Sequence, residues 1–167
     1  TEQKSISTER TFQQDTTDAQ KLETLLIAMA ENLAFQLRQG NKLTACVSLK
    51  IRYSDFQTYN LQKRIPYTSS DKVLLQVTKD LFKRLYQRRV LVRLVGLRFS
   101  HLVRGGLQIH LFDDSAEIIR LYQAMDRMRE RYGAQAVKRA KTLESKGLGR
   151  ANPFNGKPPV IMAHRRA

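Results

Sequence analysis

Residues 43–53 alternate between apolar and polar side chains along almost their whole length. One parity carries Leu43, Ala45, Val47, Leu49, Ile51 and Tyr53, and the other carries Thr44, Cys46, Ser48, Lys50 and Arg52. A period of two with one polar side is typical of a strand that buries one face and leaves the other in water. The pattern therefore predicts a one-sided sheet around this strand.

Two other segments have the helical period of three to four residues. The first begins at a cap within residues 15–18, ends at Gly40, and repeats apolar side chains at Leu22, Leu25, Leu26, Met29, Leu33 and Leu37. The second begins at the Ser69–Ser70 cap, ends in the basic run Arg88–Arg89, and repeats Leu74, Val77, Leu81 and Leu85. Caps followed by such apolar stripes predict two amphipathic helices.

Strands are also expected at residues 4–12, at residues 58–65 before Pro66, and at residues 90–103. The order βαββαβ predicts an α+β fold, a four-stranded antiparallel sheet with both helices on one face. If the helices cover one parity of the strands, the open face presents Ser48, Lys50, Arg52, Gly96, Arg98 and Ser100. Short hydroxyl and cationic side chains with little apolar bulk suit contact with a phosphate backbone.

The C-terminal third is organised differently. Gly105–Gly106 precedes a short apolar segment and the acidic pair Asp113–Asp114. A helix is expected from a cap near Ser115 to Gly133, and a second one at residues 134–145. Later residues lack periodicity and predict a mostly disordered tail. The expected organisation is therefore a compact domain (1–104), a linker (105–114), a small helical extension (115–147) and a tail (148–167).

The charge balance indicates the class of partner. The 167 residues carry 30 Lys and Arg against 15 Asp and Glu, a formal net charge of +15. Such an excess favours a polyanion, either nucleic acid or an anionic membrane surface. No apolar stretch reaches the roughly 18 residues of a membrane span, and the N-terminus does not have the pattern of a signal peptide. The single cysteine, Cys46, fits a reducing compartment, so a cytoplasmic protein without a membrane partner is expected.

Three ordered motifs resemble a known family. They are KSISTERTF at residues 4–12, VSLKIRYSDFQT at 47–58 and VRLVGLRFSHL at 92–102. Together they resemble the little-finger domain of the Y-family translesion DNA polymerases, in the bacterial DNA polymerase IV branch. RYGAQAVKRA at residues 131–140 is also similar to C-terminal extensions of that branch. The resemblance implies a monomeric domain that lies in the DNA major groove and grips the duplex, the primer-template, through its backbone.

Carried over position by position, the resemblance implies DNA contacts on each strand. The first strand would contribute Ser5, Ser7 and Thr8, the second Lys50 and Arg52, and the fourth Arg98 and Ser100. The third strand departs from the family, which often has Thr-Arg-Ser where this chain has Asn60, Leu61 and Gln62. The expected contacts of that strand therefore shift to Lys63 and Arg64.

The pentapeptide at residues 108–112, Gln-Ile-His-Leu-Phe, is the second candidate site. It resembles the Gln-Leu-x-Leu-Phe peptide by which bacterial polymerases bind the sliding clamp, and it follows the last strand, where that branch carries its clamp peptide. The resemblance implies clamp contacts by Gln108, Ile109, Leu111 and Phe112. The alternative is that Ile109 and Leu111 pack as an extra edge strand on their own sheet.

Catalytic chemistry is not expected in this chain. Two-metal phosphoryl transfer needs carboxylates on a strand pair, whereas Asp113–Asp114 stands before a helix, where such residues act as caps. His101, His110 and His164 lack the spacing of metal ligands, and no histidine is placed to activate Cys46. The resemblance implies a parent DNA-directed DNA polymerase, a nucleotidyltransferase whose Mg²⁺-binding carboxylates lie in a preceding palm region. No cofactor is expected in this chain itself.

Two other functions remain open from the sequence. An RNA-recognition motif shares the βαββαβ order, but it stacks bases on a glycine- and aromatic-rich third strand. Residues 58–65 have no glycine and only one aromatic residue, Tyr59. A free-standing adaptor that binds the clamp without DNA is the other alternative.

Overall fold

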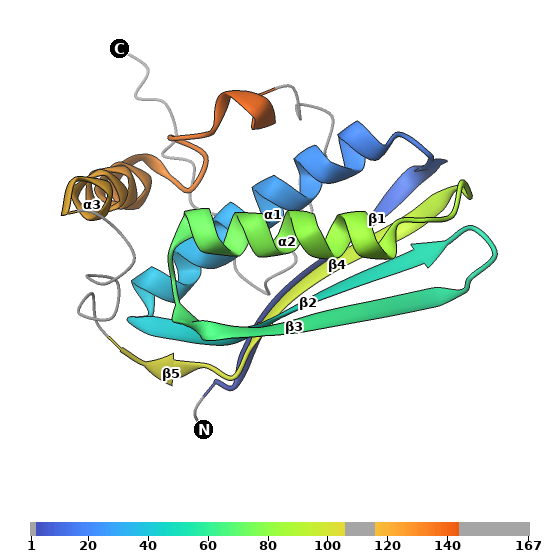
Figure 1. Cartoon of the computed structure of the whole chain (residues 1–167). Coiled ribbons are helices and arrows are strands. Elements are labelled where there is room, and N and C mark those ends of the chain that lie inside the picture. Colours follow the sequence, from blue (N-terminus) through green and yellow to red (C-terminus); the bar gives the residue numbers. More distant parts are fainter. Residues whose placement is uncertain (1–2, 106–115, 144–167) are drawn as a thin grey trace, which may run out of the picture.

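The computed structural model describes residues 3–105 and 116–143. The elements are β1 (Ser5–Thr16), α1 (Ala19–Gln39), β2 (Lys42–Tyr53), β3 (Thr58–Thr68), α2 (Asp71–Leu85), β4 (Val92–Ser100), β5 (Val103–Arg104), α3 (Ala116–Tyr132) and a 3₁₀ turn at Ala140–Thr142. Helices α1 and α2 lie side by side on one face of the sheet (Figure 1). The α+β fold with both early helices on one face is therefore confirmed.

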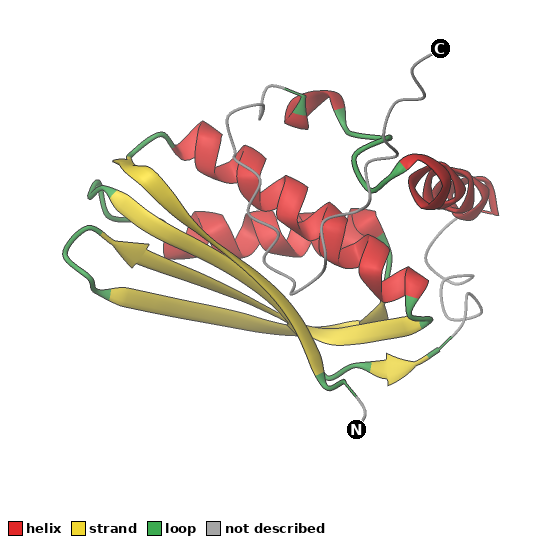
Figure 2. Cartoon of the chain, turned by 180° about the vertical axis from the view of Figure 1, so that it is seen from behind, coloured by secondary structure: helices red, strands yellow, loops and turns green. Residues whose placement is uncertain are grey.

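The main sheet has the strand order β1-β4-β2-β3, and every neighbouring pair is antiparallel. The short strand β5 pairs with the start of β2. Strands β4 and β2 are therefore central, and β1 and β3 form the two long edges. Seen from behind, the sheet is twisted, with α1 and α2 along one side only (Figure 2).

The core lies between the sheet and the two helices. The helix-facing side chains of the central strands are at most 1% exposed, and they are Val47, Leu49, Ile51, Val95, Leu97 and Phe99. The predicted apolar stripe of α1 is buried against them, as are Leu74, Val77 and Leu81 of α2. Full burial of each such side chain contributes roughly 1.5–3 kcal/mol before entropy is counted. The apolar side chains that the strand and helix periods predicted therefore pack together in one core.

The ends of α1 follow the predicted signals with one change. The side chain of Asp18 accepts hydrogen bonds from the backbone N–H of Gln20 at 3.0 Å and of Lys21 at 3.1 Å. At the other end, Gly40 has an ordinary φ of −82°, and Asn41 takes the left-handed conformation at φ 49°. Asparagine tolerates this region better than most residues, so Asn41 makes the turn into β2.

The strands differ from their predicted lengths at several ends. β3 continues through Pro66 to Thr68, which an edge strand tolerates because a proline there loses no essential ladder hydrogen bond. β4 ends at Ser100 instead of continuing to residue 103, because His101 adopts a left-handed φ of 55°. After this turn, residues 103–104 pair with the start of β2, where Arg104 faces Lys42, in the same register as β4.

The expected helix at residues 134–145 is wrong over its described part. Gly133 ends α3 at φ 100°, residues 134–137 form turns and bends, and only a 3₁₀ turn follows at residues 140–142. This segment is tied to α1 by side chains: Arg139 pairs with Glu31, and Lys141 pairs with Glu23 at 3.2 Å. These tertiary contacts outweigh the alanine-rich helix propensity of the segment. The expected disordered tail lies outside the described residues.

Charged groups hold α3 against the two core helices. Arg38 of α1 contacts Asp71 of α2 at 2.7 Å and Asp126 of α3 at 2.5 Å, and Asp126 also pairs with Arg129 at 3.4 Å. Burial lowers the pKa of Arg38, but hydrogen bonds and charges from Asp126 and Asp71 outweigh burial, so this pKa lies above its ordinary value. The guanidinium therefore stays charged and joins three helices.

Replacing Arg38 with Met should lower the free energy of unfolding by about 3–5 kcal/mol. The reason is that the Asp71 side chain, which has no exposed area, would keep a buried charge without this cationic partner. Urea denaturation followed by circular dichroism measures the loss. Lys141→Met is the control, because it breaks an ion pair whose lysine is half exposed and should cost about 1 kcal/mol or less. Equal losses in the two variants would contradict the structural role of Arg38.

Candidate nucleic-acid interface

The sheet has a second face, opposite α1 and α2, which we call the open face. The strand register defines it as four rows that each cross β1, β4, β2 and β3. The rows are Ser5–Ser100–Cys46–Arg64, Ser7–Arg98–Ser48–Gln62, Glu9–Gly96–Lys50–Asn60 and Thr11–Leu94–Arg52–Thr58. Because these strands bury their other parity beneath the helices, polar side chains gather in these rows.

Most of the sequence-predicted DNA contacts share this face. From four separate strands, the register brings together Ser5, Ser7, Lys50, Arg52, Arg64, Arg98 and Ser100. The open-face parity expected for β2 and β4 is confirmed by the same pairings. Arg98 and Arg64 are exposed, and Lys50 and Arg52 are partly exposed. Four cationic side chains therefore line one surface that carries no helix in the described part of the chain.

Two of the predicted residues lie elsewhere. Thr8 pairs with Leu97 in a row of the helix-facing side and is only 6% exposed, so its hydroxyl is not at the open face. Lys63 pairs with Val47 and also belongs to the helix-facing parity of the edge strand. Neighbouring residues of a strand point to opposite faces, so Ser7 with Thr8, and Lys63 with Arg64, could not share one surface. This alternation was visible in the sequence and would have separated both pairs.

The open face also contains polar residues that the sequence analysis did not select. Asn60 and Gln62 lie in the rows of Lys50 and Ser48, although their departure from the family pattern had moved the expectation to their neighbours. Glu9 is an acidic residue in the middle of the face. Alternate residues of a strand share a face, so the sequence of residues 58–65 and 4–12 could have placed Asn60, Gln62 and Glu9 on the open face.

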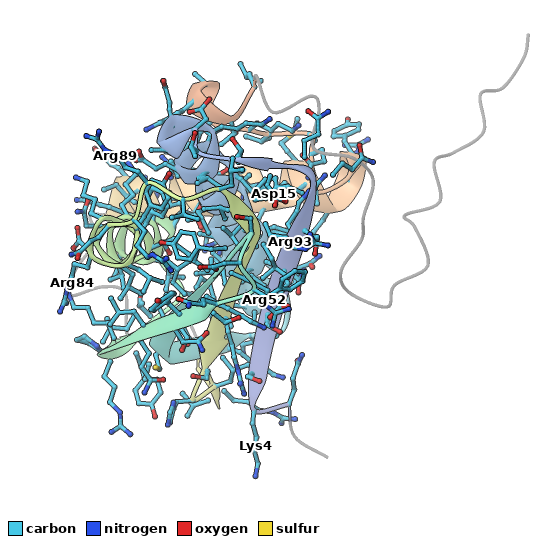
Figure 3. The ribbon with its side chains drawn as sticks, turned by 90° about the vertical axis from the view of Figure 1, so that its right-hand side faces the viewer. Lys4, Asp15, Arg52, Arg84, Arg89 and Arg93 are labelled. Atoms are coloured by element: carbon cyan, nitrogen blue, oxygen red, sulfur yellow. The ribbon has the colours of Figure 1, made fainter. Side chains whose placement is uncertain are left out.

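Three of the four cations of the open face are held by partners on other strands of the sheet. Lys50 Nζ donates to Glu9 Oε1 at 2.9 Å, Arg52 Nε donates to Thr58 Oγ1 at 2.8 Å, and Arg98 Nη2 donates to Ser5 Oγ at 3.0 Å. An arginine carries five N–H donors, so one such bond orients the side chain and uses one donor. Viewed from one end of the sheet, Arg84 and Arg89 lie on the side of α2, away from Arg52 (Figure 3). The arrangement can therefore offer several oriented donors to anionic oxygens.

The described residues offer no comparable site for metal chemistry. Among residues 3–105 and 116–143, no three His, Cys, Asp or Glu side chains gather as metal ligands. Cys46 is a buried free thiol at 1% exposure. A cavity of about 40 Å³ between α1 and the C-terminal extension is far smaller than the roughly 300 Å³ of an ordinary ligand pocket. The candidate clamp peptide and Asp113–Asp114 lie outside the described residues.

Within the described part of the chain, no helix has the length and apolar character needed to cross a membrane.

Comparisons with known proteins agree with the motifs. The model of the impB/mucB/samB family C-terminal domain matches residues 3–111. DNA polymerase IV of Clostridium acetobutylicum is 33% identical over 145 residues, which cover 84% of this chain and 36% of that protein. The chain thus spans about a third of the length of the curated relatives it matches.

Two solved structures show the likeness in three dimensions. DinB from Sulfolobus solfataricus superposes with a TM-score of 0.51 at 15% identity, over 61% of this chain and 29% of that one. The complex of the beta-clamp processivity factor and the little finger domain of PolIV gives a TM-score of 0.48 at 21% identity, over 57% of this chain and 86% of that one. The first of these likenesses supports the fold.

The family match covers more than half of the chain, and it includes every strand of the open face. The chain therefore belongs to the impB/mucB/samB family, as its C-terminal, little-finger domain, and is homologous to the C-terminal part of DNA polymerase IV.

Proposed function

We propose that this chain is the C-terminal part of an error-prone translesion DNA polymerase involved in DNA repair. In that enzyme it would grip duplex DNA and tether the polymerase to a sliding clamp. The observation that carries the proposal is the open face, where Lys50, Arg52, Arg64 and Arg98 stand among hydroxyl and amide side chains. Such groups bind phosphate oxygens, and phosphate contacts carry no sequence information. The proposed binding is therefore independent of DNA sequence.

The open face supports a phosphate grip better than base stacking. An RNA-recognition motif presents aromatic rings on its exposed sheet face. β3 has two aromatic residues, Tyr59 and Tyr67, and neither lies in the four rows. Tyr59 pairs with Ile51 in the helix-facing parity and makes an edge contact with Tyr53 at 5.7 Å between ring centroids. None of the sixteen residues in the four rows is aromatic. The alternative RNA-binding function therefore lacks its platform.

The polymerase chemistry itself is proposed for the parent protein, not for these residues. Nucleotidyl transfer uses two Mg²⁺ ions held by carboxylates. The described residues contain no fitting cluster, so we assign the catalytic carboxylates and Mg²⁺ to a palm region that precedes residue 1. Residues 1–104 would act as a monomeric DNA-gripping domain of a bacterial cytoplasmic enzyme. Residues 105–114 would be the clamp-binding linker, 115–147 the helical extension and 148–167 the tail.

The clamp contact is proposed for Gln108, Ile109, Leu111 and Phe112. Burying the leucine and phenylalanine in an apolar pocket is worth roughly 1.5–3 kcal/mol each, and the glutamine amide adds orientation through hydrogen bonds. The peptide begins shortly after the last strands in the sequence, since β4 ends at Ser100 and β5 at Arg104. It would therefore bring the clamp beside the DNA-gripping surface. A free-standing adaptor would bind the clamp but no DNA.

Duplex DNA binding should fall steeply with salt. If the wild-type chain neutralises about four to six phosphates, the slope of log K against log salt should be near −4 to −5, because each contact releases about 0.9 of a counterion. Replacing Lys50, Arg52 and Arg98 together with Ala should flatten this slope by about two to three, because Lys50 is also paired with Glu9. Fluorescence anisotropy with a labelled duplex measures it.

The matched control removes three cations from the opposite layer. Lys72, Lys83 and Arg84 are exposed on α2, so their joint replacement with Ala makes the same change in charge on the helical side of the sheet. Figure 3 shows Arg84 on that side. This control should keep a slope close to that of the wild type. If the two triple variants behave alike, the open face is not the DNA-binding surface.

Changing Leu111 and Phe112 to Ala should abolish binding to a purified bacterial sliding clamp in calorimetry. Thermal stability and DNA affinity should stay nearly unchanged, because the proposed anchors serve the clamp and not the core. Leu121→Ala with Met128→Ala is the control, since these α3 side chains are 56% and 47% exposed. A double variant that unfolds, or that binds the clamp as the wild type does, would show that the segment is structural.

The chain alone should extend no primer in the presence of Mg²⁺ and nucleoside triphosphates. The described residues lack the clustered carboxylates that two-metal catalysis requires. A primer-extension assay on a labelled template tests this, with a complete DNA polymerase IV as the positive control. Template-dependent extension by the chain would contradict the assignment of catalysis to a preceding region.

A further inference from the structure

The centre of the open face contains an ion pair that spans a whole strand. Glu9 on β1 and Lys50 on β2 both pair in register with Gly96 on β4, which runs between them. Lys50 Nζ nevertheless lies 2.9 Å from Glu9 Oε1. Neighbouring strands are about 4.8 Å apart, so the two side chains must reach across the middle strand to meet. The contact therefore depends on the residue beneath it.

Gly96 makes this contact possible because it has no side chain. A Cβ built at this position would lie 2.9 Å from Cγ of Glu9 and 3.3 Å from its Oε1. Gly96 is buried even though it belongs to the open-face row, so Glu9 lies directly over it. Glycine in a strand interior often marks a place where another group approaches closely. Here that group is the carboxylate side chain that holds Lys50.

Glu9 is also the only acidic residue among the sixteen positions of the four rows. The Lys50 and Glu9 side chains are 30% and 49% exposed, so both groups can be reached from outside. A phosphate that approaches Lys50 must displace this carboxylate or lie beside a like charge. The pair as a whole is neutral, and it therefore contributes little to the phosphate-binding charge of the face.

We propose that Glu9 competes with DNA phosphate for Lys50 and thereby limits how tightly the open face holds the duplex. The inference rests on the proposed function, because it concerns the regulation of that same surface. When a phosphate leaves, Glu9 takes Lys50 back, so the ammonium is never left without an anionic partner. A grip that must move along DNA by one nucleotide at a time benefits from a contact that is exchanged in this way.

The first test compares Glu9→Gln with the wild-type chain in anisotropy titrations on a labelled duplex. The variant frees one cation, so it should bind about three- to tenfold more tightly near 0.1 M salt, with a salt slope steeper by about 0.9. Glu23→Gln is the matched control, because Glu23 also pairs with a lysine, Lys141 at 3.2 Å, but on the helical side. It should change the affinity by less than twofold and leave the slope unchanged.

The second test separates competition from simple repulsion. In the Lys50→Met variant, adding Glu9→Gln should raise the log affinity by clearly less than half as much as it does in the wild-type chain. The reason is that the lysine that Glu9→Gln would free is no longer present. An equal gain in both backgrounds would overturn the proposal and leave only repulsion between Glu9 and DNA. Melting curves of all variants, expected within a few degrees of each other, establish that the sheet is intact.

The outcomes distinguish this inference from the proposed function. If the wild-type chain binds duplex DNA and Glu9→Gln binds no more tightly than Glu23→Gln, the inference is wrong while the DNA-gripping function stands. If neither the wild type nor Glu9→Gln binds duplex DNA at low salt, the proposed function is wrong, and the inference falls with it.

Discussion

The structure depends on the two-residue period of its central strands. β4 and β2 bury one parity completely beneath α1 and α2, so every alternate residue has to lie on the other side of the sheet. A slip of the register by one residue would carry the cations of β2 into the core and expose its valine, leucine and isoleucine. Burial of the core thus fixes which polar side chains meet on the open face. The candidate site is in this sense a product of the packing behind it.

The two sides of the molecule are held by different forces. The sheet and the first two helices meet through apolar side chains, whereas α3 docks through Arg38, Asp71, Asp126 and Arg129. Tyr122 joins this interface, accepting a hydrogen bond from the backbone N–H of Lys72 at 3.1 Å. In the same region, burial raises the pKa of Glu31, and its partner Arg139 offsets part of that rise. The extension is therefore attached by directional charged contacts, away from the open face.

The open face illustrates how a basic surface can be ordered before it meets its partner. Arg98, Arg52 and Lys50 are each held by a side chain on another strand of the sheet, which reduces the freedom lost on binding. The hydroxyl partners leave the positive charge of the arginines uncompensated, whereas the carboxylate of Glu9 compensates that of Lys50. Cations of equal formal charge therefore differ in what they can offer to a phosphate.

The sequence by itself determined the element order, the buried stripes and most of the open face, because periods of two and of three to four residues record which side of each element is apolar. The resemblance of three motifs also identified the family. Only the tertiary structure decided that His101 ends β4 and that residues 134–139 form no helix. It alone revealed the Arg38 cluster and the Glu9–Lys50 pair, which join residues 33, 88 and 41 positions apart. Local patterns cannot encode such contacts, because strand pairing and helix docking create them.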